Sequence, residues 1–243
     1  MKFEKAEYRH FIHIQFYVMR TALWSVFSQK RWIDDPWMIC KAENKIYQLK
    51  LAEKVGLSLP ETIITSDPIA VKEFCDNTNN DVVVKILSPS PMVGNVIYTN
   101  VIKDTDIDSI NSLRLSPAIF QARVPKSYEL RITIVGESIF PVRINSQGDE
   151  QTAIDWRRKP KLNDFDVLME SVSLPTEIET QIRMFMKEIG LKYGCIDMIV
   201  TPDNKYVFLE INPSGQWYFV QLKTEVKIAE AMAKPERVAW AKY

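Results

Sequence analysis

The segment YGCIDMIVTPDNKYVFLEINPSGQW, residues 193–217, decides the fold of this 243-residue chain. Two runs rich in β-branched and aromatic residues, Cys195–Val200 and Tyr206–Ile211, flank the turn sequence Pro-Asp-Asn-Lys. Short apolar runs on either side of such a turn predict a β-hairpin. The apolar neighbours within both runs indicate that this hairpin is well buried.

The turn fixes which residues of the hairpin face each other. If Asp203 and Asn204 form a two-residue turn, counting back along both strands places Asp197 directly opposite Glu210. Asn212 lies two residues further on and points to the same face, because side chains alternate along a strand. The hairpin therefore predicts two carboxylates and an amide on one face.

Two carboxylates that face each other repel, at a cost of about 4 kcal/mol for a separation of roughly 4 Å and an effective dielectric constant of about 20. Like charges opposite one another destabilise a sheet unless one is protonated or a cation lies between them. An all-oxygen ligand set suits Mg²⁺ or Mn²⁺ rather than zinc. An edge hairpin whose carboxylates reach water or pair with lysines is an equally simple interpretation, and it stays open at this point.

Composition excludes several classes of function. Lys plus Arg and Asp plus Glu both number 31, so no net charge attracts nucleic acid or an anionic membrane. Cys40, Cys75 and Cys195 are far apart and lack metal or redox spacing, which fits a reducing cytoplasm. With two histidines, the chain offers little for histidine catalysis or zinc binding. Polar residues interrupt the apolar run 11–27, so it is neither a membrane span nor a signal peptide.

The remaining elements alternate between helical and strand patterns. Periodicity predicts helices at about 4–28, 41–55, 68–76, 106–113, 176–189 and 224–234, and strands at about 61–65, 81–87, 96–102, 118–124, 129–135 and 139–145. Thr176 and Glu179 match the spacing of a capping box. Alternation puts Glu129, Arg131 and Thr133 on one strand face, which needs carboxylates or phosphates as partners. The long polar segment 146–166 is typical of a functional loop.

Two lysines lie where they could bind phosphate. Lys85 ends a predicted strand and is followed by the small-residue loop 88–95 and another strand. Backbone N–H groups and a lysine in such an arrangement can cover a triphosphate. A plain hairpin with a surface lysine explains the same pattern. Lys45 lies in a predicted helix, where most lysines are simply solvated.

Several stretches together resemble one superfamily. AENKIYQLKLAEKVGLSLPETIIT, FQARVPKSYELRITIVG, the Asp-Trp-Arg at 155–157 and FLEINPSGQW are similar to the graspetide synthetases, the microviridin-type and grasp-with-spasm branch of the ATP-grasp superfamily. The resemblance covers roughly Trp32 to Ala233. It implies an α+β ATP-grasp fold in which two subdomains clamp ATP between antiparallel sheets, with residues 41–123 as the nucleotide lid and 124–243 as the magnesium and substrate subdomain. Relatives usually carry further strands and helices before this part, so residues 1–40 are expected to be a shortened helical remnant.

The resemblance also implies a role for individual residues. It assigns ATP binding to Lys45, Lys85, Gln121, Arg123, Val124, Lys126 and Glu129, with the lysines at positions 45 and 85 on the phosphates, 121–126 at the adenine edge and Glu129 on the ribose. It assigns Mg²⁺ binding to Asp197, Glu210 and Asn212. Arg131 and Arg143 are expected to face the γ-phosphate and the acyl phosphate, and Asp155, Trp156 and Arg157 the peptide substrate, with Arg157 among the catalytic groups.

The activity implied is ATP-dependent macrocyclisation of a ribosomal precursor peptide, with two Mg²⁺ ions or Mn²⁺. An Asp or Glu carboxylate, activated as an acyl phosphate, joins a Thr or Ser hydroxyl as a lactone or a Lys amine as a lactam. Expected partners are a precursor peptide with a leader segment and a second copy of the chain, without nucleic acid or membrane. Two alternatives stay open: another ATP-grasp carboxylate–amine ligase, such as an amino-acid or glutamate ligase, and a nucleotide-binding or peptide-binding module without catalysis.

Overall fold

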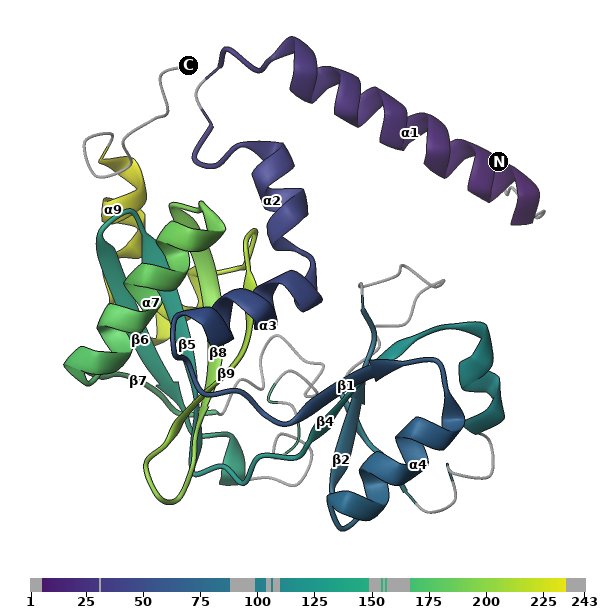
Figure 1. Ribbon diagram of the computed structural model, residues 1–243. Coiled ribbons are helices and arrows are strands. Elements are labelled where there is room, and N and C mark those ends of the chain that lie inside the picture. The colour runs from purple at the N-terminus through teal and green to yellow at the C-terminus, as the bar shows by residue number, and fades with distance from the viewer. Residues whose placement is uncertain are drawn as a thin grey trace.

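The computed structural model describes residues 6–30, 32–87, 99–103, 106, 110–148, 154, 156 and 167–234. These residues form two lobes, each built on one antiparallel sheet with helices against it (Figure 1). The predicted α+β class with two antiparallel sheets is confirmed.

The smaller lobe is a four-stranded sheet of order β1-β4-β2-β3. Its strands are β1 (Thr62–Thr65), β2 (Val82–Lys85), β3 (Asn100–Val101) and β4 (Ala118–Ala122). Helix α4 (Pro68–Asn77) covers one face, where Phe74, Val82 and Phe120 are buried together. As predicted, this helix begins at a proline, and the Asp67 carboxylate caps it by accepting the N–H of Ile69.

The larger lobe is a five-stranded sheet of order β7-β6-β5-β8-β9. Its strands are β5 (Tyr128–Val135), β6 (Ser138–Ile144), β7 (Met169–Ser171), β8 (Tyr193–Val200) and β9 (Tyr206–Asn212). Helices α3 (Lys45–Lys54) and α7 (Thr176–Ile189) bury Ile132, Phe185 and Phe208 on one face. Short helices α8 (Tyr218–Thr224) and α9 (Ile228–Ala233) pack on the other face, near its β5–β6 end. The described part of the chain also has two 3-10 helices, η1 (Ile110–Leu115) and η2 (Ser146–Gly148).

Two connections join the lobes, residues 55–61 from α3 to β1 and residues 123–127 from β4 to β5. At the smaller lobe, the N–H of Ala122 donates to the Glu61 carbonyl at 2.9 Å and the N–H of Arg123 to the Asp81 carbonyl at 2.7 Å, so both connections start from ladders of that sheet. Other hydrogen bonds fix both connections to the larger lobe. The Ser58 carbonyl accepts an N–H of β9, and the N–H of Ser127 donates to the last residue of β8, both at 2.8 Å.

Helix α1 (Ala6–Val26) extends away from both sheets (Figure 1). Its contact with the body includes an edge-to-face pair between Trp24 and Trp37, with ring centroids 5.4 Å apart; Trp37 lies on α2 (Pro36–Ala42). Large apolar side chains of α1 are exposed, including Phe16 at 63% and Val26 at 72%. No helix in the described part of the chain is both long enough and apolar enough to span a membrane.

Asp34 anchors the segment before α2 to the larger sheet. Its carboxylate accepts the backbone N–H groups of Lys192 at 2.7 Å and Tyr193 at 2.8 Å, and the residue is 9% exposed. Burial raises the pKa of Asp34 to about 6 although both hydrogen bonds oppose the rise.

This anchor makes stability depend on pH. Because the pKa of Asp34 is 3.8 in its ordinary state and about 6 in the fold, the folded protein holds an extra proton between those values. The contribution is complete below about pH 4 and is lost as the pH rises through about 6. We expect the free energy of unfolding of wild type minus that of Asp34→Asn to fall by about 2 kcal/mol from pH 4 to pH 7. Urea unfolding of both proteins measures this, and a pH-independent difference would contradict it.

The predicted hairpin forms, but its turn and one of its strands differ from the prediction. Its turn holds three residues rather than two, closed by Thr201 and Lys205, with Asn204 at a positive φ of 59°. A β-bulge then adds one residue to β9 between the partners of Asp197 and Met198. The two deviations cancel, so Asp197 still pairs with Glu210.

Several helix predictions are wrong in detail. The helix expected at 41–55 begins at Lys45, because Asn44 caps α3 and separates it from α2. The helix expected at 224–234 is α9, which begins only at Ile228; α8, which ends at Thr224 before the positive φ of Glu225, has no prediction. No capping box opens α7, since Glu179 pairs with Arg183 at 2.7 Å instead. Of the helix expected at 106–113, Asp106 is helical and Ile110 begins the 3-10 helix η1, whereas residues 107–109 and loop 88–95 lie outside the described residues.

Candidate functional site

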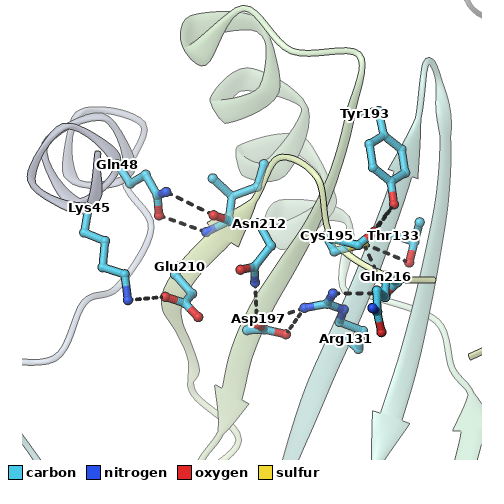
Figure 2. A network of polar contacts seen from close by, with 12 residues as sticks. Lys45, Gln48, Arg131, Thr133, Tyr193, Cys195, Asp197, Glu210, Asn212 and Gln216 are labelled. Atoms are coloured by element: carbon cyan, nitrogen blue, oxygen red, sulfur yellow. Dashed lines mark hydrogen bonds and ion pairs between the residues drawn. The ribbon is translucent and has the colours of Figure 1, made fainter. Parts of the chain in front are cut away.

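Polar side chains gather on the face of the larger sheet that is opposite α7. Arg131 on β5 pairs with Asp197 on β8, and Asp197 pairs with Glu210 on β9. The next pair on that face brings Asn212 opposite Cys195. Since directly paired residues point the same way, these groups share one surface, as Figure 2 shows.

Asp197 is held by a buried ion pair. Both of its oxygens accept from Nη1 of Arg131, at 2.9 and 3.0 Å, and the two side chains are 8% and 15% exposed. Nη2 of Arg131 donates to the Gln216 carbonyl at 3.1 Å, and Asn212 donates its amide to Asp197 at 2.9 Å. Burial is the largest single effect and lowers the pKa of Arg131, but Asp197, Cys195 and Tyr193 together outweigh it, so the pKa is raised and the guanidinium stays charged.

Glu210 has a different partner. Its Oε2 lies 2.9 Å from Nζ of Lys45, the first residue of α3, and these side chains are 15% and 22% exposed. The repulsion predicted between the two facing carboxylates is therefore relieved by two cations, one for each. The alternative of a lysine partner holds for Glu210, whereas Asp197 pairs with Arg131.

The oxygen donors of this face fit a hard cation that shares its shell with phosphate. Asp197, Glu210 and Asn212 offer two carboxylates and an amide. Mg²⁺ is commonly bound through one or two carboxylates, with phosphate and water oxygens completing an octahedron. Within the described ranges no group of three or more His, Cys, Asp or Glu forms an all-protein metal cage.

Glu129 lies in a second buried network at the start of β5. Its Oε1 accepts from Nζ of Lys126 at 2.6 Å and from Oγ of Ser146 at 2.9 Å, and Glu129 is 8% exposed. Burial raises the pKa of Glu129, while Lys126 acts to lower it. Lys126 also donates to the Ile154 carbonyl at 3.2 Å. The ammonium of Lys126 is therefore bound to the protein itself, and its backbone remains for contact with an adenine edge.

The other predicted nucleotide residues lie on the smaller sheet and on the connection from β4 to β5. Gln121 is 3% exposed and donates its amide to the Thr62 hydroxyl at 3.1 Å. Gln121 pairs with the residue two positions before Lys85, so both side chains point away from α4. Arg123 is exposed in an ion pair with Asp81, and Val124, partly buried, follows it.

The expectation that Arg143 faces the same site as Arg131 is wrong. Arg143 pairs with Leu130, whose side chain lies on the α7 face, so the guanidinium lies on the opposite side of the sheet from Asp197. It stacks 4.2 Å above the Tyr128 ring. Nε of Arg143 donates to Asn145 at 2.7 Å and lies 3.3 Å from Glu170.

Of the predicted substrate triplet, the structure describes Trp156, which is partly buried. Its ring lies 5.4 Å from that of Phe219 at 34° and packs on the cluster around Val220 and Ile228. Trp156 therefore packs into the larger lobe. Asp155 and Arg157 lie outside the described residues.

No role is predicted from the sequence for Gln48 or Gly215, two further residues at the site. Gln48 lies in the stretch 42–65 that resembles the graspetide synthetases, but an isolated glutamine carries no chemical signal. At Gly215 an added Cβ would lie 2.7 Å from Cβ of Cys195 and 2.8 Å from Nη2 of Arg131. The chain passes so close to Arg131 there that any side chain would displace the guanidinium. The sequence Pro-Ser-Gly indicates a turn, and only the fold shows what it approaches.

Comparison with solved structures decides the family. The macrocyclase MdnC of Microcystis aeruginosa MRC, solved with its precursor peptide MdnA, is 34% identical at a TM-score of 0.80; the alignment covers 94% of this chain and 71% of MdnC. The chain belongs to the ATP-grasp macrocyclases. The chain is also 30% identical to a RiPP-associated ATP-grasp ligase of Chryseobacterium gregarium, solved with ADP and a leader and core peptide. That alignment has a TM-score of 0.82 and covers 94% of this chain and 69% of the ligase.

The macrocyclase MdnB of Microcystis aeruginosa MRC is 30% identical with a TM-score of 0.76, over 96% of this chain and 71% of MdnB. No protein-family model and no curated protein matches the chain. The predicted resemblance to the graspetide synthetases is confirmed. Like its family, this macrocyclase is an ATP-dependent peptide ligase.

Proposed function

We propose that this macrocyclase activates an Asp or Glu side chain of a ribosomal precursor peptide as an acyl phosphate and joins it to a side-chain hydroxyl or amine of the same peptide. ADP and phosphate are the products of ATP. The observation that carries the proposal is the pair of adjacent carboxylates, Asp197 and Glu210, each held beside a cation on one sheet face. That arrangement suits phosphate oxygens and metal ions together.

The binding roles follow the lobes. The smaller lobe, from β1 to β4, is the nucleotide lid, residues 124–243 are the magnesium and substrate part, and residues 1–40 are a helical extension. The predicted lid of residues 41–123 is too long, because α3 packs in the core of the larger lobe, to which it adds Lys45. The backbone of 121–126 meets the adenine edge, Glu129 the ribose, and Lys45 and Lys85 the phosphates. The position of Lys45 beside Glu210 supports its phosphate role, since phosphates that share a metal ion with Glu210 come within its reach.

Asp197, Glu210 and Asn212 would hold Mg²⁺, with two ions expected and Mn²⁺ able to replace them. Bound there, the metal supplies charge neutralisation at the transferring phosphoryl group. Arg131 orients Asp197 by donating to both of its carboxylate oxygens. The Gln216 carbonyl fixes Arg131 in turn.

The reaction needs two displacements. A peptide carboxylate oxygen attacks the γ-phosphorus, the bond to the β-phosphate oxygen breaks, and ADP leaves. A Thr or Ser hydroxyl, or a Lys amine, then attacks the acyl carbon and loses its proton as phosphate leaves, giving a lactone or a lactam. Arg131 and Lys45 are the cations of the described site that stand nearest the charge that develops.

Calorimetric titration with ADP tests the nucleotide site. We expect binding that requires Mg²⁺ and that weakens about tenfold in Lys85→Ala, because a charged contact to phosphate is lost. Lys72→Ala is the matched control, since Lys72 is an exposed lysine of α4, on the opposite face of the same sheet. Binding that ignores Mg²⁺, or that falls equally in both variants, would contradict the proposal.

Mass spectrometry tests the ligation. Short peptides that contain repeated Thr or Ser and Asp or Glu, encoded near this gene, are incubated with the protein, ATP and Mg²⁺. We expect the loss of one water for each ring formed. Mild base then separates the two chemistries, because lactones reopen and regain water whereas lactams do not.

A homodimer is part of the same proposal, with α1 as its interface. Spacings of four and three residues place Tyr8, Ile12, Gln15, Met19, Ala22 and Val26 on one stripe of the helix. An antiparallel second copy would set Tyr8 against Val26 and Ile12 against Ala22, a larger side chain against a smaller one in each case. Within this stripe Tyr8 and Met19 are each 54% exposed and Val26 is 72% exposed, so the stripe presents apolar side chains to water in a single copy.

Light scattering on the eluting protein tests this interface. We expect twice the monomer mass for the wild type and the monomer mass for Met19→Glu, because a charge would be buried in the middle of the stripe. Arg20→Glu changes the adjacent residue on the side that faces Trp24 and is the control. A wild-type monomer, or a Met19→Glu dimer, would contradict the interface.

A further inference from the structure

Gln48 is a buried glutamine with every polar hydrogen of its amide in use. It is 2% exposed, and Nε2 donates to the Ala42 carbonyl at 2.7 Å and to the Ile211 carbonyl at 3.0 Å. Its Oε1 accepts the N–H of Ile211 at 3.0 Å. The amide thus pairs with both backbone groups of one residue in β9, as a neighbouring strand would (Figure 2).

This contact closes the open edge of the larger sheet. β9 is an edge strand, and its outward backbone groups need partners. Phe208 donates its outward N–H to the Ser58 carbonyl, and Ile211 is bound by Gln48. These positions are three residues apart rather than two because the bulge lies between them. The Ala42 contact ties the end of α2 to the same point.

Gln48 fixes the position of α3 along strand β9, which apolar packing leaves poorly determined. Leu51 and Ala52 bury the same helix against the core, but apolar contacts are non-directional and permit sliding along a strand. Two hydrogen bonds to a single residue of β9 set the position along the strand and the rotation of the helix. Lys45 lies one turn earlier on the side of Gln48, and its ammonium meets Glu210, the residue next to Ile211.

We propose that Gln48 is a positioning residue, which holds the start of α3 on β9 so that Lys45 stands at Glu210 and at the phosphates bound there. The proposal rests on the proposed function for the phosphate role of Lys45. Its geometric part, the placement of Lys45 at Glu210, does not depend on that function. It is tested separately.

The first test needs no nucleotide. Reductive methylation with formaldehyde, followed by mass spectrometry of each lysine, reports how well an ion pair protects Lys45. In Gln48→Met we expect methylation of Lys45 relative to the exposed Lys50 to rise about threefold, because Lys45 loses its fixed partner. Gln48→Glu keeps the side-chain length and one acceptor, and it serves if the methionine variant does not fold.

The control for lost stability is Ile182→Ala, which opens a cavity in the same core from α7 and leaves the hydrogen bonds of Gln48 in place. Its ratio of Lys45 to Lys50 methylation is expected to equal that of the wild type. An unchanged ratio in both Gln48 variants, or the same rise in Ile182→Ala, would overturn the proposal.

The second test joins Gln48 to nucleotide binding by a double-mutant cycle. Gln48→Met should weaken Mg²⁺-ADP binding about tenfold in the wild type and leave it unchanged in the Lys45→Ala background, because its effect passes through Lys45. An equal loss in both backgrounds would show a purely structural role and refute the positioning. If the wild type binds no Mg²⁺-ADP, the proposed function fails, and the methylation ratio alone decides the placement of Lys45.

Discussion

Glu210→Ala is expected to lower ATP turnover by a factor on the order of 10³ and to abolish magnesium-dependent ADP binding, since it removes one of two carboxylates from the proposed metal site. The fold should survive. Lys45, the partner of Glu210, is 22% exposed at the start of α3 and can return to water when the carboxylate is gone. We therefore expect a loss of at most about 1 kcal/mol in the free energy of unfolding.

Glu188→Ala is the matched control for this variant. Glu188 pairs with Lys54 at 2.7 Å, so it also joins α3 to the larger lobe, but on the outer surface. Turnover with ATP and Mg²⁺, measured beside thermal unfolding of both variants, separates the two cases. Equal turnover in Glu210→Ala and Glu188→Ala would remove Glu210 from the metal site.

Asp197→Ala is expected to cost about 3–5 kcal/mol of folding free energy in addition to activity, because it leaves a buried guanidinium without a counter-charge. Arg131 is 6% exposed and cannot turn to water, since the Gln216 carbonyl holds its other nitrogen. Its Nε is already a buried donor without a hydrogen-bond partner among the described residues. Loss of Asp197 is thus expected to cost both stability and activity, whereas loss of Glu210 costs activity with little change in stability.

A double substitution separates two causes of lost stability, the loss of the ion pair itself and the burial of an unpaired Arg131 charge. Arg131→Met combined with Asp197→Leu removes both charges, and we expect urea unfolding to show a double variant more stable than Asp197→Ala alone. Neither protein should turn over ATP. A stable Asp197→Ala protein, within about 1 kcal/mol of the wild type, would mean that Arg131 finds another partner.

The site hairpin shows how far a sequence pattern reaches. Counting from a two-residue turn predicted that Asp197 faces Glu210, and that pairing is confirmed although the turn is one residue longer than predicted. The bulge restores the predicted pairing. A bulge is difficult to predict from local sequence, because it depends on the geometry of the whole sheet. The agreement at Asp197 therefore reflects the burial of the core face, which tolerates no slip.

Arg143 and Gln48 mark two different limits. Arg143 was assignable by the same counting, because the tight turn at Gly136 sets it opposite Leu130, on the core face. The family resemblance alone assigned it an active-site role. Gln48 carries no such clue, since its value comes from a backbone group more than 160 residues away in the chain. Contacts of that kind depend on tertiary structure, and no local propensity encodes them.

The two connections between the lobes have a mechanical consequence. Each is held at both ends: the bonds at Ser58 and Ser127 fix them to the larger lobe, and the bonds of Ala122 and Arg123 fix them to the smaller sheet. Two chains that cross between two bodies act as two pivots, and the line through the pivots is the axis about which rotation deforms them least. The smaller lobe is therefore expected to turn about that line, as a door turns on two hinges, and to resist sliding and twisting.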